Sequence, residues 1–448
     1  MLSAFNTLTK KKEKINKKKL NLFVCGPTVY DYSHLGHAKT YTQFDFIVKY
    51  LRYRKHDVFY LQNITDIDDK IIQRAKEQKI TPKKLAKTFE KIYYEDMKSL
   101  HNDAVTKYAR ATDYIPQIIS QIKTLIKKDY AYKLKDGYYF NIRKFKEYGK
   151  LSGRTILEAE DAVTRIDDSL NKKNKGDFCL WRFSKKGEPE WNSEFGKGRP
   201  GWHIEDTAIT ETFFGPQYDI HGGALDLIFP HHEAEIAQME ASSGKKPLVN
   251  YWIHTGFLNI KGKKMAKSLG NFMTIREALE KYNYKVLRYL FLSNHYKTPL
   301  DFTENMLEQS KNSLERINEL ALKSKGKPTK LTKTYMEKTK KEFISHLDND
   351  FNTPNAFSVL FDFIREANTK GAGNEAFNFL KEINNIFDIL TLTTDKKINK
   401  EIKELIQKRE RARKNRDFKL ADKIRSDLNK KGIILEDTEK GVRWKKII

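Results

Sequence analysis

The chain has few cysteines and no long hydrophobic run. Only Cys25 and Cys179 occur among its 448 residues, which excludes a disulfide-stapled fold and favours reduced thiols. No stretch approaches the roughly 18 consecutive apolar residues of a membrane span, and the first residues contain no apolar signal-like segment. We therefore expect a cytoplasmic protein with no membrane partner.

Acidic residues are outnumbered by basic ones. Lys and Arg total 85 against 59 Asp and Glu, which gives a net charge of +26. This excess fits a polyanionic partner such as nucleic acid. The abundance of Lys, Ile and Asn is also what a biased genome base composition would produce. The charge by itself therefore leaves the partner open.

The pattern along the chain predicts several structural units, because domains contain about 100 to 200 residues each. Residues 20–24 form an apolar run, residues 41–53 are amphipathic at helical spacing, and residues 57–62 form a second apolar run. This alternation is typical of a parallel α/β sheet, whose ligands gather at the carboxyl ends of the strands. Helical periodicity dominates residues 305–395, and the last fifty residues contain basic helices and a hairpin.

Two histidines stand three residues apart where the first strand gives way to the first helix, in His34-Leu-Gly36-His37. Free backbone N–H groups and the helix dipole favour anions there, and Gly36 lets a nucleotide approach closely. Taken alone, the pattern also fits two capping histidines. Far downstream, Lys264-Met-Ala-Lys267-Ser268 lies in a lysine-rich loop. In this order, the two motifs are a known signature of adenylylation by ATP.

Four side chains form a candidate metal site. His231 and Glu235 are four residues apart at a predicted helix start, which is metal-ligand spacing. Residues 201–206 are predicted to be a strand end that carries Asp206, and Cys25 follows the first strand. These four side chains could converge as a tetrahedral zinc site. The alternative is an ordinary capped helix with surface charge.

Six motifs together resemble bacterial cysteinyl-tRNA synthetases, which are class I enzymes. They are the histidine motif, the lysine motif and residues 65–70, 201–205, 229–233 and 350–354. The resemblance runs from about residue 20 to the end of the chain. It implies an α/β Rossmann-type parallel-sheet catalytic domain with an insertion, then an α-helical bundle and a small α+β module.

The resemblance also implies domain bounds and site residues. The expected units are the catalytic halves 1–111 and 196–250, the connective insertion 112–195, a stem-contact region 251–304 with the lysine loop, the bundle 305–395 and an anticodon-binding module 396–448. The implied catalytic residues are His34, His37, Lys264 and Lys267. The implied binding residues are Gly36, Asp226 and Lys267 for ATP, and Thr65, Trp202 and His221 for the amino acid. The implied zinc ligands are Cys25, Asp206, His231 and Glu235.

Two positions depart from the family pattern. Asp206 stands where the family has a second cysteine ligand, and Ala266 replaces the middle serine of the lysine motif. Aspartate keeps the formal charge of a thiolate and is itself a zinc ligand, but it is a harder ligand of different reach. The alternative is a site that has lost its metal and recognises the thiol through Trp202, Thr65 and His221.

The implied reaction is the ATP-dependent attachment of L-cysteine to tRNA(Cys) by way of cysteinyl-adenylate, with release of AMP and pyrophosphate. The resemblance implies one Zn²⁺ per chain, Mg²⁺ with the ATP, and a monomer. Two alternatives are a ligase that joins cysteine to a small amine and a non-catalytic RNA-binding paralogue. The basic C-terminal module argues against the first, and the retained histidines and lysines argue against the second.

Overall fold

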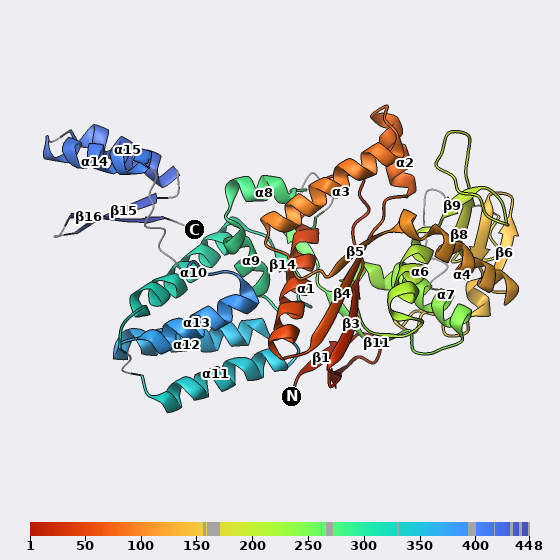
Figure 1. The fold of residues 1–448 in the computed structure, drawn as a ribbon, viewed down its shortest axis with the longest axis horizontal. Helices are drawn as coiled ribbons and strands as arrows, with labels where there is room; N and C mark the ends of the chain where they lie inside the picture. The colour runs from red at the N-terminus through yellow and green to blue at the C-terminus, as the bar shows by residue number, and fades with distance from the viewer. Residues whose placement is uncertain are drawn as a thin grey trace.

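The computed structural model describes residues 1–155, 158, 171–260, 262–265, 272–328, 331–392, 400–415, 417–430, 433–438 and 441–446. Figure 1 shows an α/β region at one end, a helical bundle in the middle and a small C-terminal unit at the other end. In the described part of the chain, no helix is both long and apolar enough to cross a membrane.

A five-stranded parallel sheet forms the centre of the α/β region, which confirms the predicted fold class. Its strand order is β11-β10-β3-β4-β5. The strands are β3 (Lys19–Val24), β4 (Asp57–Ile64), β5 (Lys107–Arg110), β10 (Tyr218–Ala224) and β11 (Val249–Thr255). Every neighbouring pair runs parallel. Because β3 lies between strands reached in opposite directions, its carboxyl end is the switch point at which such sheets bind ligands.

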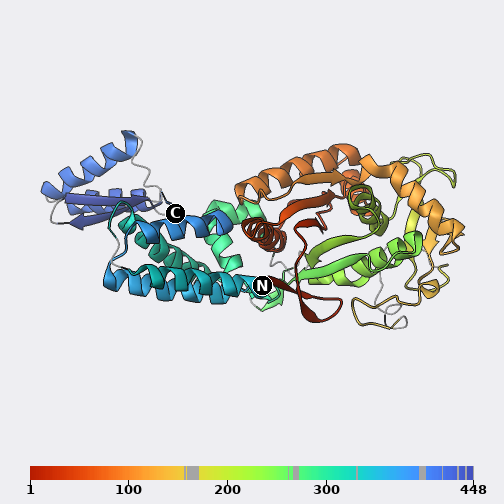
Figure 2. The same ribbon diagram turned by 60° about the horizontal axis from the view of Figure 1, so that its bottom comes forward.

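Helices cover the sheet, and Figure 2 shows them on both of its sides. The first three are α1 (Leu35–Tyr53), α2 (Asp69–Glu77) and α3 (Pro82–Ser99). Helix α1 begins six residues before the predicted 41–53, because His34 caps it. The Nδ1 atom of His34 accepts from the His37 backbone N–H at 3.3 Å, and His37 Nδ1 accepts from the His34 N–H at 3.3 Å. The histidine motif therefore builds the start of this helix.

An insertion separates β5 from the second half of the sheet. It contains short 3₁₀ turns at Ala111–Tyr114 and Ile142–Lys144, helix α4 (Ile115–Lys127), and an antiparallel sheet of β6 (Ala131–Leu134), β7 (Gly137–Phe140), β8 (Phe178–Phe183) and β9 (Gly198–Pro200). The chain then returns through α6 (Trp202–Phe214), β10, a 3₁₀ turn (Leu225–Leu227), a π turn (Ile228–His232) and α7 (Glu233–Ser243).

The predicted strand end at 201–206 is wrong. Strand β9 stops at Pro200, Gly201 is the N-cap of α6, and Asp206 lies in that helix. A Cβ atom at Gly201 would lie 1.9 Å from the Cys179 carbonyl oxygen of β8. This close approach requires glycine and turns the chain into the helix. His231 also lies in the π turn before α7, not in the helix itself.

The remaining elements follow the sheet in chain order. A small sheet contains β12 (Leu258–Ile260), β13 (Lys263–Lys264) and β14 (Leu300–Asp301), with α8 (Ile275–Lys281) and α9 (Tyr284–Leu292) between the last two. The bundle contains α10 (Glu304–Ser324), α11 (Lys333–Asp348), α12 (Thr353–Lys370) and α13 (Asn374–Phe387). The C-terminal unit contains α14 (Lys400–Lys414), α15 (Phe418–Lys430), β15 (Ile433–Thr438) and β16 (Gly441–Lys446). The predicted helical region and final hairpin are confirmed.

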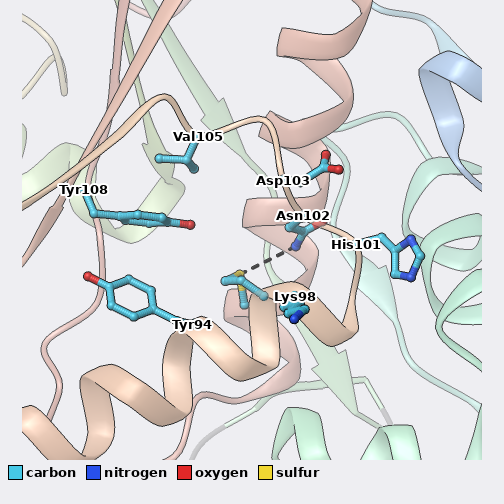
Figure 3. A pocket seen from close by; sticks show the side chains of 8 residues that line it. Tyr94, Lys98, His101, Asn102, Asp103, Val105 and Tyr108 are labelled. Carbon is cyan, nitrogen blue, oxygen red and sulfur yellow. Dashed lines mark hydrogen bonds between the residues drawn. The ribbon is translucent and has the colours of Figure 1, made fainter.

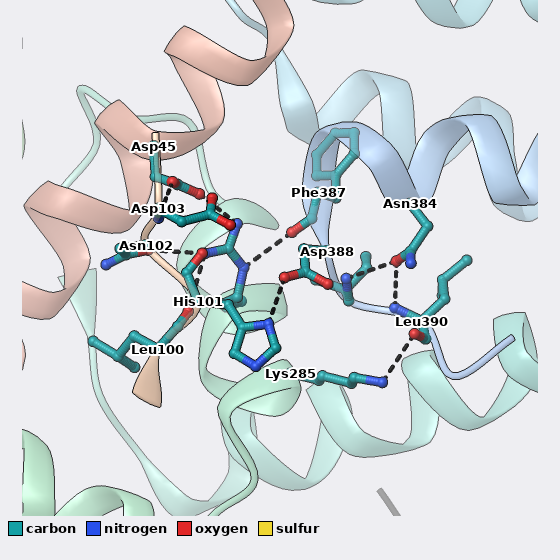
Figure 4. A network of polar contacts seen from close by, with 12 residues as sticks. Asp45, Leu100, His101, Asn102, Asp103, Lys285, Asn384, Phe387, Asp388 and Leu390 are labelled. Atoms are coloured by element: carbon teal, nitrogen blue, oxygen red, sulfur yellow. Dashed lines mark hydrogen bonds and ion pairs between the residues drawn. The ribbon is translucent and has the colours of Figure 1, made fainter. Parts of the chain in front are cut away.

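A buried arginine connects the helical bundle to helix α1 and to the segment before β5. Arg288 of α9 is fully buried, and its Nη2 lies 2.8 Å from Asp45 Oδ2 of α1. Its other N–H groups donate to the carbonyl oxygens of Leu100, His101 and Phe387 and to Asn102 Oδ1. Figure 4 shows this network together with the His101–Asp388 ion pair. Helix α1, the segment before β5 and the end of α13 therefore meet at one side chain.

Asp350, the first residue of the 350–354 motif, ties the bundle to the N-terminal hairpin of β1 (Ser3–Asn6) and β2 (Lys11–Lys14). Its Oδ1 accepts from the Phe5 backbone N–H at 2.7 Å and from the Tyr296 hydroxyl at 2.6 Å. Its Oδ2 lies 2.6 Å from Lys297 Nζ. The motif is thus a structural junction.

Asp350→Asn is expected to lower the free energy of unfolding by about 1–3 kcal/mol, because the negative partner of Lys297 at Oδ2 is replaced by a neutral amide NH2, which cannot accept from the ammonium. Urea denaturation measures this loss. Asp362→Asn is the control, since Asp362 is an exposed partner of Arg365 and such pairs contribute about 0–1 kcal/mol. Equal free energies of unfolding for the two variants would contradict the role of Asp350 as a structural junction.

Candidate active site

The carboxyl ends of the parallel strands converge on one buried group of polar side chains. Cys25 follows β3 directly, Thr65 follows β4 directly, and His221 lies within β10. All three are buried. This is the edge at which the fold places its ligands.

The four predicted metal ligands meet at this edge. Cys25, Asp206, His231 and Glu235 each offer one donor atom, and these atoms lie within 4.8 Å of one another. His231 Nε2 is 2.9 Å from Asp206 Oδ2 and 3.0 Å from Glu235 Oε1. Cys25 Sγ is 3.8 Å from Glu235 Oε1. The structure therefore contains a buried Cys/Asp/His/Glu group able to hold a metal ion.

A second group of donors shares two of these residues. Cys25, His221, His232 and Glu235 also lie within 4.8 Å of one another. Cys25 Sγ is 3.3 Å from His221 Nε2 and 3.2 Å from His232 Nε2. His232 Nδ1 in turn lies 2.8 Å from His254 Nε2, an arrangement that orients a ligating imidazole. His232 was not among the predicted ligands, although it directly follows His231 in the sequence.

The electrostatics of this group favour a cation. Burial raises the pKa of the Cys25 thiol, and the carboxylates of Glu235 and Asp206 raise it further. Burial likewise raises the pKa of Asp206 and of Glu235 and lowers the pKa of His221. Among the described residues, Asp206 Oδ1 is buried without a hydrogen-bond partner. A divalent cation would stabilise the thiolate and carboxylate forms, so the residues fit a metal.

The histidine motif and the lysine motif lie together. The His34 and His37 rings stack with centroids 3.8 Å apart. A Cβ atom at Gly36 would lie 2.9 Å from the His34 ring and 3.5 Å from Cε of Met265, the second residue of the lysine motif. Lys264 ends β13, while its side chain and all of Lys267 lie outside the described residues. The two halves of the adenylylation signature are therefore adjacent in space.

The other predicted binding residues lie on separate elements, and one of them contacts a metal-ligand side chain. Asp226 lies in the 3₁₀ turn that follows β10. Trp202 begins α6, and its ring stacks on His231 with centroids 4.1 Å apart. The Thr65 hydroxyl donates to Glu205 Oε1. Glu205, the neighbour of Asp206, is a buried residue to which the sequence analysis gave no role.

A separate pocket lies beside α3 and β5 at the edge of the sheet. It has a volume of about 610 Å³ and is lined by residues of α3 and of the segment that leads into β5, including Tyr94, His101 and Tyr108. Figure 3 shows the Tyr94 and Tyr108 rings on one side of it. None of the predicted site residues lines this pocket, so it carries no part of the candidate site.

Comparison with protein families decides which class I enzyme this fold represents. Residues 11–312 match the family model for class I (C) tRNA synthetase catalytic domains, and residues 342–416 match the DALR domain. Residues 395–444 match the cysteinyl-tRNA ligase anticodon binding domain. The chain belongs to the cysteinyl-tRNA synthetases. It is an aminoacyl-tRNA ligase that uses ATP, an amino acid and tRNA, and the resemblance read from the motifs is confirmed.

Solved structures of other class I synthetases share the fold. A Mycobacterium tuberculosis methionyl-tRNA synthetase bound to methionyl-adenylate is 15% identical, with a TM-score of 0.62 over 83% of this chain and 89% of that one. A Campylobacter jejuni arginyl-tRNA synthetase is 13% identical, with a TM-score of 0.56 over 83% and 91%. An Agrobacterium radiobacter leucyl-tRNA synthetase in a complex with tRNA is 10% identical, with a TM-score of 0.62 over 83% and 84%.

Proposed function

We propose that this cysteinyl-tRNA synthetase selects its amino acid with Zn²⁺ held by Cys25, Asp206, His231 and Glu235. The observation that carries this proposal is the convergence of four donor atoms, each on a buried side chain, at the switch point of the sheet. When bound, zinc favours a substrate thiol over an alcohol, because a thiol deprotonates far more readily on coordination. A pocket that discriminated by shape alone would separate serine from cysteine poorly. The two amino acids differ by one atom, and such a difference in a pocket contributes about 1–3 kcal/mol to binding.

Adenylate formation needs positioning and charge stabilisation. A carboxylate oxygen of cysteine attacks the α-phosphorus of ATP, and the bond from that phosphorus to pyrophosphate breaks. His34, His37, Lys264 and Lys267 stabilise the negative charge that develops on the phosphates, and Mg²⁺ accompanies the nucleotide. We assign the nucleotide contacts to Gly36, Asp226 and Lys267.

Transfer to tRNA follows at the same strand ends. A ribose hydroxyl of the terminal tRNA nucleotide attacks the adenylate carbonyl, and AMP leaves with the electron pair of the broken C–O bond. Neither step requires a protein nucleophile. Thr65, Trp202 and His221 line the amino-acid pocket and keep the acyl group oriented. We further propose that the enzyme works as a cytoplasmic monomer.

Asp206→Ala is expected to lower zinc affinity by a factor of roughly ten or more, because an anionic ligand is lost. His232→Gln, the control, should retain about one zinc per chain, since His232 belongs only to the second donor group. Elemental analysis after dialysis measures both. If His232→Gln loses zinc and Asp206→Ala retains it, the second donor group, and not the first, holds the metal.

Deletion of residues 396–448 is expected to lower tRNA charging roughly tenfold to a hundredfold and to leave cysteine-dependent pyrophosphate exchange largely intact. The segment carries its own small core of Ile406, Ile424, Leu428 and Leu435, and we assign it to anticodon binding. Phosphate contacts weaken with salt, so added salt should lower charging by the full-length enzyme more than exchange. Equal loss of both activities would mean that the segment supports the catalytic fold.

A further inference from the structure

Glu205 presents an unsatisfied carboxylate oxygen inside the site. Its side chain lies on α6 and the residue is only 1% exposed. Oε1 accepts the Thr65 hydroxyl, but Oε2 has no hydrogen-bond partner among the described residues. A buried acceptor without a donor destabilises the folded protein. Buried polar groups of this kind point to a partner that the site is built to receive.

A metal ion does not supply that partner. Glu205 belongs to neither of the two groups of metal-ligating side chains, although Asp206 beside it belongs to one. A cation held by Cys25 and Glu235 would therefore leave Glu205 Oε2 unpaired. The missing donor has to come from another component of the site.

Hydrogen bonds place Glu205 beside the loop that follows Cys25. Its partner Thr65 donates its backbone N–H to the Pro27 carbonyl at 3.2 Å and accepts the Val29 N–H at 3.1 Å. The loop and Glu205 are thus joined through one residue. Glu205 also precedes Asp206 on α6, and Asp206 Oδ2 lies 2.9 Å from His231 Nε2 in the Cys25 group.

The charge around Glu205 selects a cationic group. Burial is the largest influence on the Glu205 carboxyl, and the side chains of Asp206, Asp68 and Asp66 add further unfavourable charge. An anionic group such as the substrate carboxylate would be repelled there, whereas an ammonium would be attracted and could donate up to three N–H bonds.

We propose that Glu205 binds the α-ammonium of the cysteine substrate through Oε2. This assignment rests on the proposed cysteine-activating function and adds a contact that neither the zinc group nor the motif residues provide. The substrate is then held at two points, its thiol at the Cys25 group and its ammonium at Glu205. This leaves the carboxylate to face the nucleotide.

The test compares cysteine with 3-mercaptopropionate, which has the thiol and the carboxylate but no ammonium. In ATP–pyrophosphate exchange, the preference for cysteine in kcat/KM is expected to fall about 10- to 100-fold in Glu205→Gln, since hydrogen bonds to charged groups contribute about 1.5–3 kcal/mol. The KM for cysteine should rise, while the KM for ATP and the zinc content stay unchanged. Glu205→Asp should keep most of the preference, because it retains the charge.

Glu211→Gln is the matched control, since Glu211 is an exposed glutamate on the same helix. It should keep the wild-type preference. Equal losses for both substrates in Glu205→Gln, or an unchanged preference, would overturn the assignment and leave Glu205 with a structural role. If Glu205→Gln does not fold, an unchanged preference in Glu205→Ser would overturn it in the same way. Absence of cysteine-dependent exchange in the wild type would instead refute the proposed function itself.

Discussion

Lys267→Ala is expected to lower cysteine-dependent ATP–pyrophosphate exchange about 10²–10³-fold, because a preorganised cation that meets developing phosphate charge is removed. Lys267 itself lies outside the described residues, but its motif neighbour Met265 is buried beside Gly36 of the histidine motif. We therefore expect these two segments, which are far apart in the sequence, to act on one nucleotide. Steady-state exchange at saturating cysteine measures the effect.

Lys263→Ala is the control for this prediction, since Lys263 adjoins the motif without belonging to it. Its exchange rate should stay within a few-fold of the wild type. Circular dichroism and thermal unfolding should match for all three proteins. Nearly normal exchange by the Lys267→Ala enzyme would show that this loop does not contribute to the ATP site.

Cys25→Ala is expected to lose its zinc and most of its preference for cysteine over serine. Cys25 is common to both candidate ligand groups, so the outcome does not depend on which of them holds the metal. Sites that pair with a specific substrate group reject an analogue that lacks it by about 10⁴-fold or more. The ratio of kcat/KM for the two amino acids should therefore fall from that order toward the roughly tenfold to two-hundredfold range of a purely steric pocket.

Cys179→Ala provides the matched control, because Cys179 lies in β8 and in neither ligand group. It should keep both the zinc and the serine rejection. Removal of zinc from the wild type by a chelator should reproduce the Cys25→Ala result. A metal-free enzyme that still rejects serine fully would favour the alternative in which Trp202, Thr65 and His221 recognise the thiol unaided.

The parallel sheet could be predicted because its signals are local. Leu22, Phe23 and Val24 are all fully buried, as the continuous apolar run of a strand covered on both faces predicts. The start of α1 was predicted too late, since the reciprocal His34–His37 cap replaces the usual Ser, Thr, Asp or Asn signal.

The details of the site depend on contacts that are distant in the sequence. Asp206 was expected on a strand end and lies on a helix, because Gly201 packs against the backbone of β8, far away in the chain. His232 and Glu205 carried no separate signal. Each adjoins a predicted ligand, and only the folded packing turns the first toward Cys25 and leaves the second with an unpaired oxygen.

Amino-acid-dependent ATP–pyrophosphate exchange by the purified, zinc-loaded enzyme tests the central claim most directly. Exchange should depend on L-cysteine, and serine should support it at least roughly 10⁴-fold less efficiently. Exchange with no dependence on cysteine, or with serine as effective as cysteine, would contradict the assignment of the strand-end group to thiol selection.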